Sequence, residues 1–258
     1  MSNLLLEKTR KLNNIIQLSG KRTIAFSDLT NILKDVLDAN IYVASKRGKI
    51  LGISLVDNSD SPLIFDETTG TEHFSENDNK ELLKVESTIF NVTEEKLVDI
   101  FKNDKTSYSK FATIVPIIGR GERIGTLIVA RGSKYSDDDL ILAEYAATVV
   151  GMEIIRAKNE ADEEEARKKA IVQMAIGTLS YSEFEAIEHI FKELDGDEGL
   201  LVASKIADRV GITRSVIVNA LRKFESAGVI ESRSLGMKGT YIKVLNKKLF
   251  AELEKLNK

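Results

Sequence analysis

The sequence contains no cysteine, and its two histidines, His73 and His189, are far apart in the chain. Without cysteine the described sequence offers no disulfide, no thiolate zinc site and no cysteine nucleophile. The lack of cysteine suits a reducing compartment, and we expect a cytoplasmic protein. The sequence also lacks any uncharged run of about twenty apolar residues and any apolar leader with a small-residue cleavage site. We therefore expect neither export nor a membrane span.

The composition is close to globular averages: of the 258 residues, 43% are hydrophobic and 30% are charged. This composition supports one or two folded domains, and the length favours two. The net charge of −3 is unevenly spread, because residues 203–243 contain eight lysines and arginines but three acids. That segment carries +5 and the rest of the chain carries −8. A basic segment in an acidic protein indicates binding to a polyanion.

The N-terminal half alternates helical and strand-like patterns. Residues 3–18 have the spacing of an amphipathic helix, and a second helix is predicted to begin at Ser27, a good N-cap. Two β-hairpins are predicted at residues 41–56 and 112–130, each with glycine in its turn. The polar residues 57–110 between them are interpreted as an insertion over the sheet. This order predicts an α+β domain of the GAF or PAS sensor kind, with helices on an antiparallel sheet.

A single long helix is predicted after the second hairpin. Ser136-Asp137-Asp138-Asp139 begins a helix with acids in its first turn, and no proline follows before Gly177. The middle of this helix, residues 160–169, is too polar to lie in a core and is interpreted as a solvated rod. We therefore predict three parts: an effector domain at residues 1–136, a linking helix at residues 137–180 and a C-terminal domain at residues 181–258.

The C-terminal domain contains the most specific pattern in the sequence. Residues 203–210 predict a short helix, Gly211 a tight turn, and Thr213 the N-cap of a second helix. Three apolar residues of the second helix are expected to point inward: Val216, Ala220 and Leu221. A strand, a turn and another strand follow within residues 228–244, which is the pattern of a wing. We therefore predict a winged helix-turn-helix at the end of an α+β chain.

In winged helix-turn-helix proteins, the N-terminal end of the second helix enters the major groove of DNA. We expect Arg214, Ser215 and Asn219 to face base edges or nearby phosphates, because arginine can pair with guanine and asparagine with adenine. Four further residues are predicted to contact the DNA backbone: Ser204, Arg222, Lys223 and Lys238. The alternative for each residue is an ordinary solvated surface. Cap, turn, basic face and wing occur in the order that docking needs, which favours double-stranded DNA as the partner.

Residues 203–241 resemble the corresponding segment of the CodY family, nutrient-responsive transcriptional repressors of bacteria. The similarity extends upstream through residues 137–145, 149–154 and 113–118, whereas residues 57–110 look divergent. The resemblance implies a homodimer with a GAF-type effector domain, a long linking helix and a winged DNA-binding domain. It also implies that GTP and isoleucine-type branched-chain amino acids act as corepressors that promote operator binding.

Six residues are implicated in GTP binding by the resemblance: Ser45, Lys46, Arg47 and Lys49 at the first hairpin, and Glu153 and Lys158 on the linking helix. No Gly-x-x-x-x-Gly-Lys-Ser/Thr loop exists in the sequence, so a GTPase-type phosphate loop is excluded. Three cations on one turn can gather a triphosphate, and a carboxylate can accept hydrogen bonds that guanine donates and adenine does not. The alternative is that the turn is merely a solvated hairpin tip.

The amino-acid site departs from the family pattern. Family members hold the effector carboxylate with an arginine after the second strand, but residues 48–119 here contain no arginine. The nearest matches to the family's aromatic pocket residues are Phe74, which follows His73, and Phe101. An isolated phenylalanine is more often part of a core than of a ligand pocket. Backbone amides or a lysine would have to hold the carboxylate, or the specificity differs.

No catalytic constellation is present in the sequence. His189 falls on a predicted helix at residues 182–194, where a structural or surface histidine is the usual finding. The acidic run at residues 162–165 does not predict a metal site, since consecutive helical positions point in different directions. We therefore expect no enzyme, no catalytic cofactor and no metal. The leading hypothesis is a metabolite-regulated DNA-binding repressor, and the alternative is a sensor whose basic module docks a protein partner.

Overall fold

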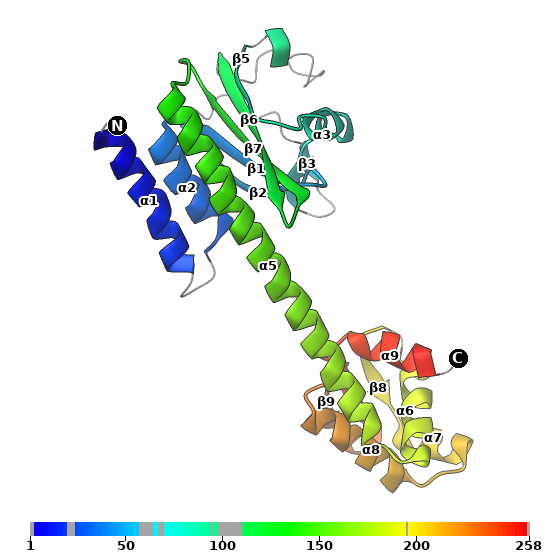
Figure 1. Ribbon diagram of the computed structural model, residues 1–258. Coiled ribbons are helices and arrows are strands. Elements are labelled where there is room, and N and C mark those ends of the chain that lie inside the picture. Colours follow the sequence, from blue (N-terminus) through cyan, green and yellow to red (C-terminus); the bar gives the residue numbers. More distant parts are fainter. Residues whose placement is uncertain are drawn as a thin grey trace. The chain divides into compact units, whose positions relative to one another are not determined.

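The computed structural model describes residues 3–19, 24–56, 64–66, 70–93, 95–97, 110–194 and 196–256. The chain divides into two compact units, Met1–Lys158 and Asn159–Lys258. Helix α5, Asp137–Gly177, is continuous through this division and confirms the prediction of one long helix (Figure 1). Of the helices in the described ranges, none is long and apolar enough to cross a membrane.

The first unit contains a five-stranded antiparallel sheet with the strand order β2-β1-β7-β6-β5. The long hairpin of β6, Phe111–Gly119, and β7, Glu122–Arg131, forms its centre. Strand β1, Asn40–Ser45, pairs with β7 on one side and with β2, Ile50–Ser54, on the other. Both predicted hairpins are therefore confirmed.

Helices cover one face of this sheet: α1, Asn3–Ser19, α2, Phe26–Leu37, and the N-terminal part of α5 (Figure 1). In α2 the buried residues Leu29, Leu33, Val36 and Leu37 recur at the three- and four-residue spacing of an amphipathic helix. They pack together with alternate residues of the central strands, because successive strand side chains point to opposite faces.

The predicted N-cap of α2 at Ser27 is wrong. The helix begins at Phe26 after Ala25, whose carbonyl accepts hydrogen bonds from the N–H groups of Asp28 and Leu29. Phe26 is half-buried against the apolar cluster that lies between the helices and the sheet. Burying an aromatic ring contributes more than one side-chain cap, so packing decides where this helix begins.

The opposite face of the sheet is covered by the segment around α3, Glu76–Leu83. Two short strands, β3, Ile64–Asp66, and β4, Thr71–His73, precede it. The predicted insertion at residues 57–110 is correct only in part, because its residues Ile89–Thr93 form β5, the edge strand beside β6. The pairing of β5 with β6 is irregular between Ile89 and Val92, which explains the weak alternation in the sequence.

The second unit combines the C-terminal part of α5 with four helices and a three-stranded antiparallel sheet of order β8-β10-β9. The helices are α6, Tyr181–Glu193, α7, Ala203–Val210, α8, Arg214–Ser226, and α9, Lys248–Leu256. The strands are β8, Glu198–Leu201, β9, Ile230–Ser234, and β10, Thr240–Val244, with the 3-10 helix η1, Gly236–Lys238, after β9. Helices α7 and α8 form the helix-turn-helix and β9 and β10 the wing, as predicted.

The turn between α7 and α8 follows the sequence prediction closely. Gly211 has φ +75°, a left-handed conformation that glycine adopts without strain. Its N–H and that of Ile212 donate to the carbonyl of Ala207, which ends α7. Thr213 is the N-cap residue of α8, but its hydroxyl is bonded to the hydroxyl of Ser215 at 2.7 Å and caps no helix N–H.

Candidate DNA-binding and effector sites

Helix α8 presents a polar stripe to solvent. Ser215, Asn219 and Arg222 are exposed and follow one another at spacings of four and three residues, which places them on one face. Arg214 is exposed at the first helical position. The opposite face is buried in the core through Ile217, Ala220, Leu221 and Phe224. The structure therefore brings the residues predicted for base contacts to one accessible surface.

The predicted phosphate contacts fall into two groups. Arg222 and Lys238 are exposed and form no ion pair or side-chain hydrogen bond with other described residues. Ser204 is exposed at the second position of α7. Lys223 differs, because its Nζ donates to Oε2 of Glu183 at 2.7 Å and to the Thr178 carbonyl at 2.8 Å. The charge of this ammonium is therefore balanced inside the domain, which distinguishes Lys223 from Arg222 and Lys238.

Three exposed residues near the predicted DNA contacts were not singled out from the sequence. Val218 lies on α8 with 37% of its surface exposed. Lys205 is exposed in the first turn of α7, and Arg233 is exposed on β9. Helical spacing places Val218 three residues after Ser215, which is the available signal. However, an apolar residue such as Val218 is ordinarily assigned to the core, so its exposure was not expected from the sequence.

The predicted GTP residues of the first hairpin lie on a tight turn between β1 and β2. The Ser45 N–H donates to the Lys49 carbonyl at 2.8 Å, and the Gly48 N–H donates to the Ser45 carbonyl at 2.9 Å. Gly48 has φ +83°, which favours glycine at this position. Lys46, Arg47 and Lys49 are all exposed. The turn therefore offers three cations to solvent within four residues.

Hydrogen bonds from both sides hold this turn. Nδ2 of Asn79 on α3 donates to the Lys46 carbonyl at 3.2 Å, and the Phe74 N–H donates to the Gly48 carbonyl at 3.1 Å. The Lys46 N–H donates to the Ile124 carbonyl at the start of β7, at 2.9 Å. The turn is therefore fixed both to the sheet and to the segment that covers its second face.

The two helix residues predicted for GTP binding lie on α5. Glu153 is 6% exposed, whereas Lys158 is exposed. Ile154, the neighbour of Glu153, lies close to Gly125 of β7: a Cβ atom added to that glycine would be 3.4 Å from Cδ1 of Ile154. The residue before Gly125 accepts the hydrogen bond from the turn. Helix α5 therefore passes the start of β7, to which the hairpin turn is bonded, in the region of Glu153.

The two residues predicted to line the site of the amino-acid effector, Phe74 and Phe101, have different outcomes. Phe74 is 2% exposed and belongs to the apolar cluster between the sheet and α3, whereas Phe101 lies outside the described residues. A hollow of about 540 Å³ that is partly open to solvent, here named the β5 cavity, runs along β5 and is lined by residues 88–93 and Lys96. Its volume is in the range of small-molecule sites. Among the described residues of the cavity, Lys96 is the one that carries a charge. The sequence analysis did not predict β5, because apolar and polar residues alternate only weakly along it.

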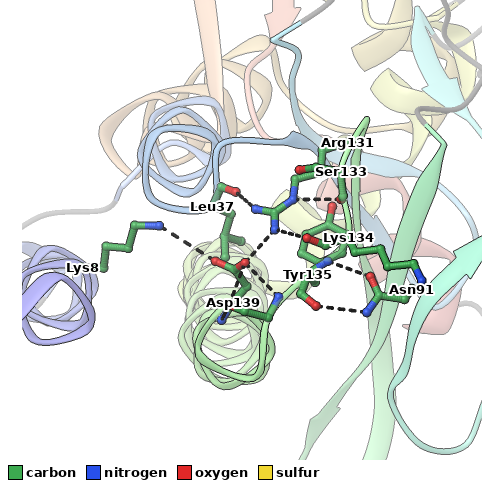
Figure 2. Close-up of polar contacts among 9 residues, drawn as sticks. Lys8, Leu37, Asn91, Arg131, Ser133, Lys134, Tyr135 and Asp139 are labelled. Carbon is green, nitrogen blue, oxygen red and sulfur yellow. Dashed lines mark hydrogen bonds and ion pairs between the residues drawn. The ribbon is translucent and has the colours of Figure 1, made fainter. Parts of the chain in front are cut away.

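Polar contacts join β5 to the end of β7 and to the start of α5 (Figure 2). Asn91 of β5, in a left-handed conformation with φ +51°, donates from Nδ2 to the Tyr135 carbonyl at 3.0 Å and accepts from the Tyr135 N–H at 2.7 Å. The guanidinium of Arg131 lies 4.1 Å from the centre of the Tyr135 ring. It also donates to Oδ2 of Asp139 at 2.6 Å. One wall of the β5 cavity is therefore bonded to the residues that begin α5.

The ion pair of Arg131 and Asp139 is largely buried, with side-chain exposures of 15% and 14%. Burial alone would raise the pKa of Asp139, but hydrogen bonds from Arg131 and Ser136 outweigh it and hold that pKa below its usual value. The guanidinium also donates to the carbonyls of Leu37, Ser133 and Lys134. One charged pair therefore fixes the ends of α2 and β7 to the first turn of α5.

Fold and sites together define a class of protein. The first unit is a helix-covered antiparallel sheet with a ligand-sized cavity and an exposed cationic turn. The second unit is a winged helix-turn-helix with an accessible basic face. A sensor domain and a DNA-binding domain in one chain are the parts of a ligand-controlled transcription factor.

Comparison with known proteins identifies the family. The model of the CodY GAF-like domain matches residues 4–178, and that of the CodY helix-turn-helix domain matches residues 197–257. Proteins named global transcriptional regulator CodY are 57% identical in Clostridium perfringens (strain SM101) and 58% in Clostridium acetobutylicum; the alignments cover 98% of this chain and 98% and 99% of the relatives. The cofactor-binding GAF domain of the nutrient sensor CodY from Clostridium difficile is 44% identical, with 60% of this chain and 99% of that chain covered and a TM-score of 0.49. The chain belongs to the CodY family.

Proposed function

We propose that this protein is a metabolite-controlled transcriptional repressor whose winged helix-turn-helix binds double-stranded operators. The exposed face of α8 carries the proposal, because Arg214 and Arg222 have no internal partner among the described residues and lie beside Ser215 and Asn219. Cations that are not balanced inside a protein release counterions when they bind phosphates. Relatives named global transcriptional regulators support this role. Since its target is the bacterial chromosome, we place the protein in the cytoplasm.

The salt dependence of DNA binding tests this proposal, with an operator selected by the protein itself from random duplexes. Lys238→Ala should weaken binding to all duplexes and reduce the slope of log K against log salt by about 0.9, the value for one phosphate. Arg214→Ala or Asn219→Ala should reduce operator preference by about 1–3 kcal/mol. Lys192→Ala, an exposed residue of α6, is the control. Unchanged preference in both variants would contradict these base contacts, and affinity for a protein but not for DNA would favour the docking alternative.

We propose that GTP binds the cationic turn with its triphosphate and reaches Glu153 and Lys158 on α5 with its remaining groups. Two observations support this placement: Lys46, Arg47 and Lys49 are exposed, and α5 passes near Gly125 of β7, next to the residue that bonds the turn. In titration calorimetry Lys46→Ala/Arg47→Ala should lose affinity for GTP. Arg10→Ala/Lys11→Ala removes the same charge from exposed positions of α1 and should bind GTP normally. Normal GTP binding by Lys46→Ala/Arg47→Ala would refute the assignment of the GTP site to this turn. Steady phosphate release from GTP would contradict a purely regulatory role.

We place a branched-chain amino acid such as isoleucine in the β5 cavity, with Lys96 holding its carboxylate. The described lining combines the apolar residues Ile89, Phe90 and Val92 with one ammonium, that of Lys96, which suits a small carboxylate with an apolar side chain. In thermal-shift measurements isoleucine should stabilise the protein more than alanine, by about 0.8 kcal/mol per additional buried carbon. Lys96→Met should abolish this shift and leave GTP binding intact. Phe74→Leu and Phe101→Leu test the two residues that the sequence predicts for the amino-acid site; Phe74 lies in the apolar cluster against α3 and is not among the described residues of the cavity. A shift with another amino acid alone would overturn the choice of isoleucine.

We further propose that the protein acts as a homodimer. Helix-turn-helix dimers place two recognition helices about one DNA turn apart, roughly 34 Å, and read operators with two-fold symmetry. Sedimentation equilibrium should then give twice the chain mass of 28.7 kDa. A monomer at the concentrations that saturate the operator would contradict the dimer. The proposed DNA contacts on α8 would not be affected by that result.

A further inference from the structure

Lys223 of α8 joins three helices of the second unit. Its ammonium donates to the carbonyl of Thr178, directly after the C-terminal end of α5, and to Oε2 of Glu183 in the first turn of α6. The same carboxylate oxygen accepts the N–H of Ser180 at 2.7 Å in the capping box that begins α6. One side chain therefore ties α8, the predicted recognition helix, to the end of the linking helix.

The charge of Lys223 is already used in this contact. The hydrogen bond from Lys223 lowers the pKa of Glu183, so the carboxylate is ionised at neutral pH and the pair is neutral overall. A phosphate beside this ammonium would also lie beside a carboxylate. Arg222, the preceding residue, has no such partner in the described part of the chain. Two adjacent cations of α8 therefore have different surroundings.

An open hollow of about 780 Å³ adjoins these contacts, with Ala175 and Thr178 on one wall and Asn219 and Arg222 on the other. Side chains do not pack closely across an open hollow, so the two hydrogen bonds of Lys223 are a direct link between its walls. Asn219 precedes Lys223 by four residues and lies one turn away along α8. The link is thus next to the side chain that is predicted to read adenine.

We propose that Lys223 is a positioning residue for DNA recognition: it fixes α8 against the end of α5 through Thr178 and Glu183, and it binds no phosphate. The inference rests on the proposed DNA-binding function. Hydrogen bonds to bases require donor–acceptor distances near 2.7–3.2 Å, so a shift of α8 by about an ångström weakens base contacts. Contacts with phosphates tolerate such a shift better, since they depend mainly on charge.

The test compares two duplexes of equal length, the selected operator and a scrambled sequence, by fluorescence anisotropy over a range of salt. Lys223→Met should lower the ratio of operator to scrambled affinity about tenfold, as expected for one weakened base contact, and leave the salt slope unchanged. Arg222→Met is the matched control, and its slope should fall by about 0.9. Lys223→Arg should restore the ratio, because a guanidinium can donate both hydrogen bonds.

Glu183→Ala distinguishes positioning from simple electrostatics. Removing an acid and freeing the ammonium should raise affinity for the scrambled duplex, yet the operator ratio should fall as it does in Lys223→Met. The double variant Lys223→Met/Glu183→Ala should have no lower ratio than either single variant, since both break one link. All variants are compared at a temperature where circular dichroism shows them folded.

Two results would overturn the positioning role. A salt slope reduced by about 0.9 in Lys223→Met would show a phosphate contact. An unchanged operator ratio in both single variants would show that the ion pair only stabilises the domain. Equal binding of both duplexes by the unmodified protein would overturn the proposed DNA-binding function itself. This outcome is distinguishable from failure of the positioning role, because it is measured on the unmodified protein alone.

Discussion

Replacing Arg131 by methionine tests whether the contacts in Figure 2 stabilise the first unit. Methionine keeps an unbranched stem but removes the guanidinium, which bonds Asp139 and three backbone carbonyls and lies over the Tyr135 ring. The carbonyls of Ser133 and Lys134 belong to exposed residues and can bond water instead. The loss therefore falls mainly on the ion pair and on the cation–π contact.

The magnitude follows from how buried the pair is. An exposed ion pair contributes about 0–1 kcal/mol, whereas removing one partner of a buried pair costs about 3–5 kcal/mol. With side-chain exposures of 15% and 14%, Arg131 and Asp139 lie between these cases. Asp139 keeps its hydrogen bonds from Ser136, and Nζ of Lys8 is 4.0 Å from its Oδ1. We expect Arg131→Met to lower the free energy of unfolding of the first unit by about 2–3 kcal/mol.

Hydrogen–deuterium exchange with mass spectrometry on the full chain measures this quantity for each unit separately. Peptides from β7 and the first turns of α5 should exchange faster in Arg131→Met, and peptides from α8 should not change. Arg10→Met, an exposed position on α1, should alter the free energy by less than about 0.5 kcal/mol. In an Asp139→Asn background the cost of Arg131→Met should fall by about half, because no unpaired charge remains. An equal cost in both backgrounds would refute the reasoning.

The pH dependence of the free energy of unfolding gives an independent check on whether the Arg131–Asp139 pair is stabilising. The pKa of Asp139 is lowered in the folded protein, so its contribution is present above the unfolded value of about 3.9 and is lost as the pH falls through the folded value. Arg131→Met removes the main hydrogen bond that lowers this pKa. The difference in stability between the two proteins should therefore be largest near neutral pH and should narrow below about pH 4.

Two further substitutions test the other sites. Gly48→Ala should lower GTP affinity in calorimetry, because a Cβ would lie 2.9 Å from Cγ of Asn79 at φ +83°, whereas Gly121→Ala, at φ +80° with open space around it, should leave GTP affinity unchanged. If the exposed side chain of Val218 contacts the methyl group of a thymine in the selected operator, Val218→Ala should weaken that contact. Replacing that thymine by deoxyuridine should cost the unmodified protein about 0.8 kcal/mol and cost the variant nothing, and an equal cost in both would exclude Val218 as a thymine contact.

The helix-turn-helix could be predicted because its signals are local. Gly211 takes the left-handed conformation that the turn needs, and the apolar spacing on α8 identifies its buried face within one helix. The hairpin turn with Gly48 was predicted for the same reason. In each case a few neighbouring residues determine the backbone, so the sequence pattern and the structure agree.

Strand β5 and the ion pair of Lys223 with Glu183 could not be predicted, because distant residues determine both. Asn91 in β5 is held by Tyr135, 44 positions further along the chain, and the resulting irregular strand lacks clean alternation. Lys223 shares the exposed side of α8 in any helical plot, yet its partner Glu183 lies 40 positions away. Periodicity shows which face a residue occupies, but it does not show what neutralises its charge.

Strand β7 connects the candidate effector sites to the long helix. At its start the guanidinium of Arg123 donates to the carbonyls of Leu82 and Val85 at the C-terminal end of α3, at 3.4 and 2.5 Å. At its end Arg131 bonds the first turn of α5. Charged side chains therefore join the end of α3 to the start of β7, and the end of β7 to α5.

A ligand changes the helix only if it binds better to one arrangement of these contacts than to another. Asn91 lines the β5 cavity and bonds Tyr135, two positions before α5 begins, so the path from cavity to helix consists of two hydrogen bonds. The cationic turn bonds Phe74 and Asn79 of the same covering segment. Both candidate sites thus touch residues 70–93. Ligand preference can change in that segment while the sheet, the long helix and the DNA-binding face keep their structure.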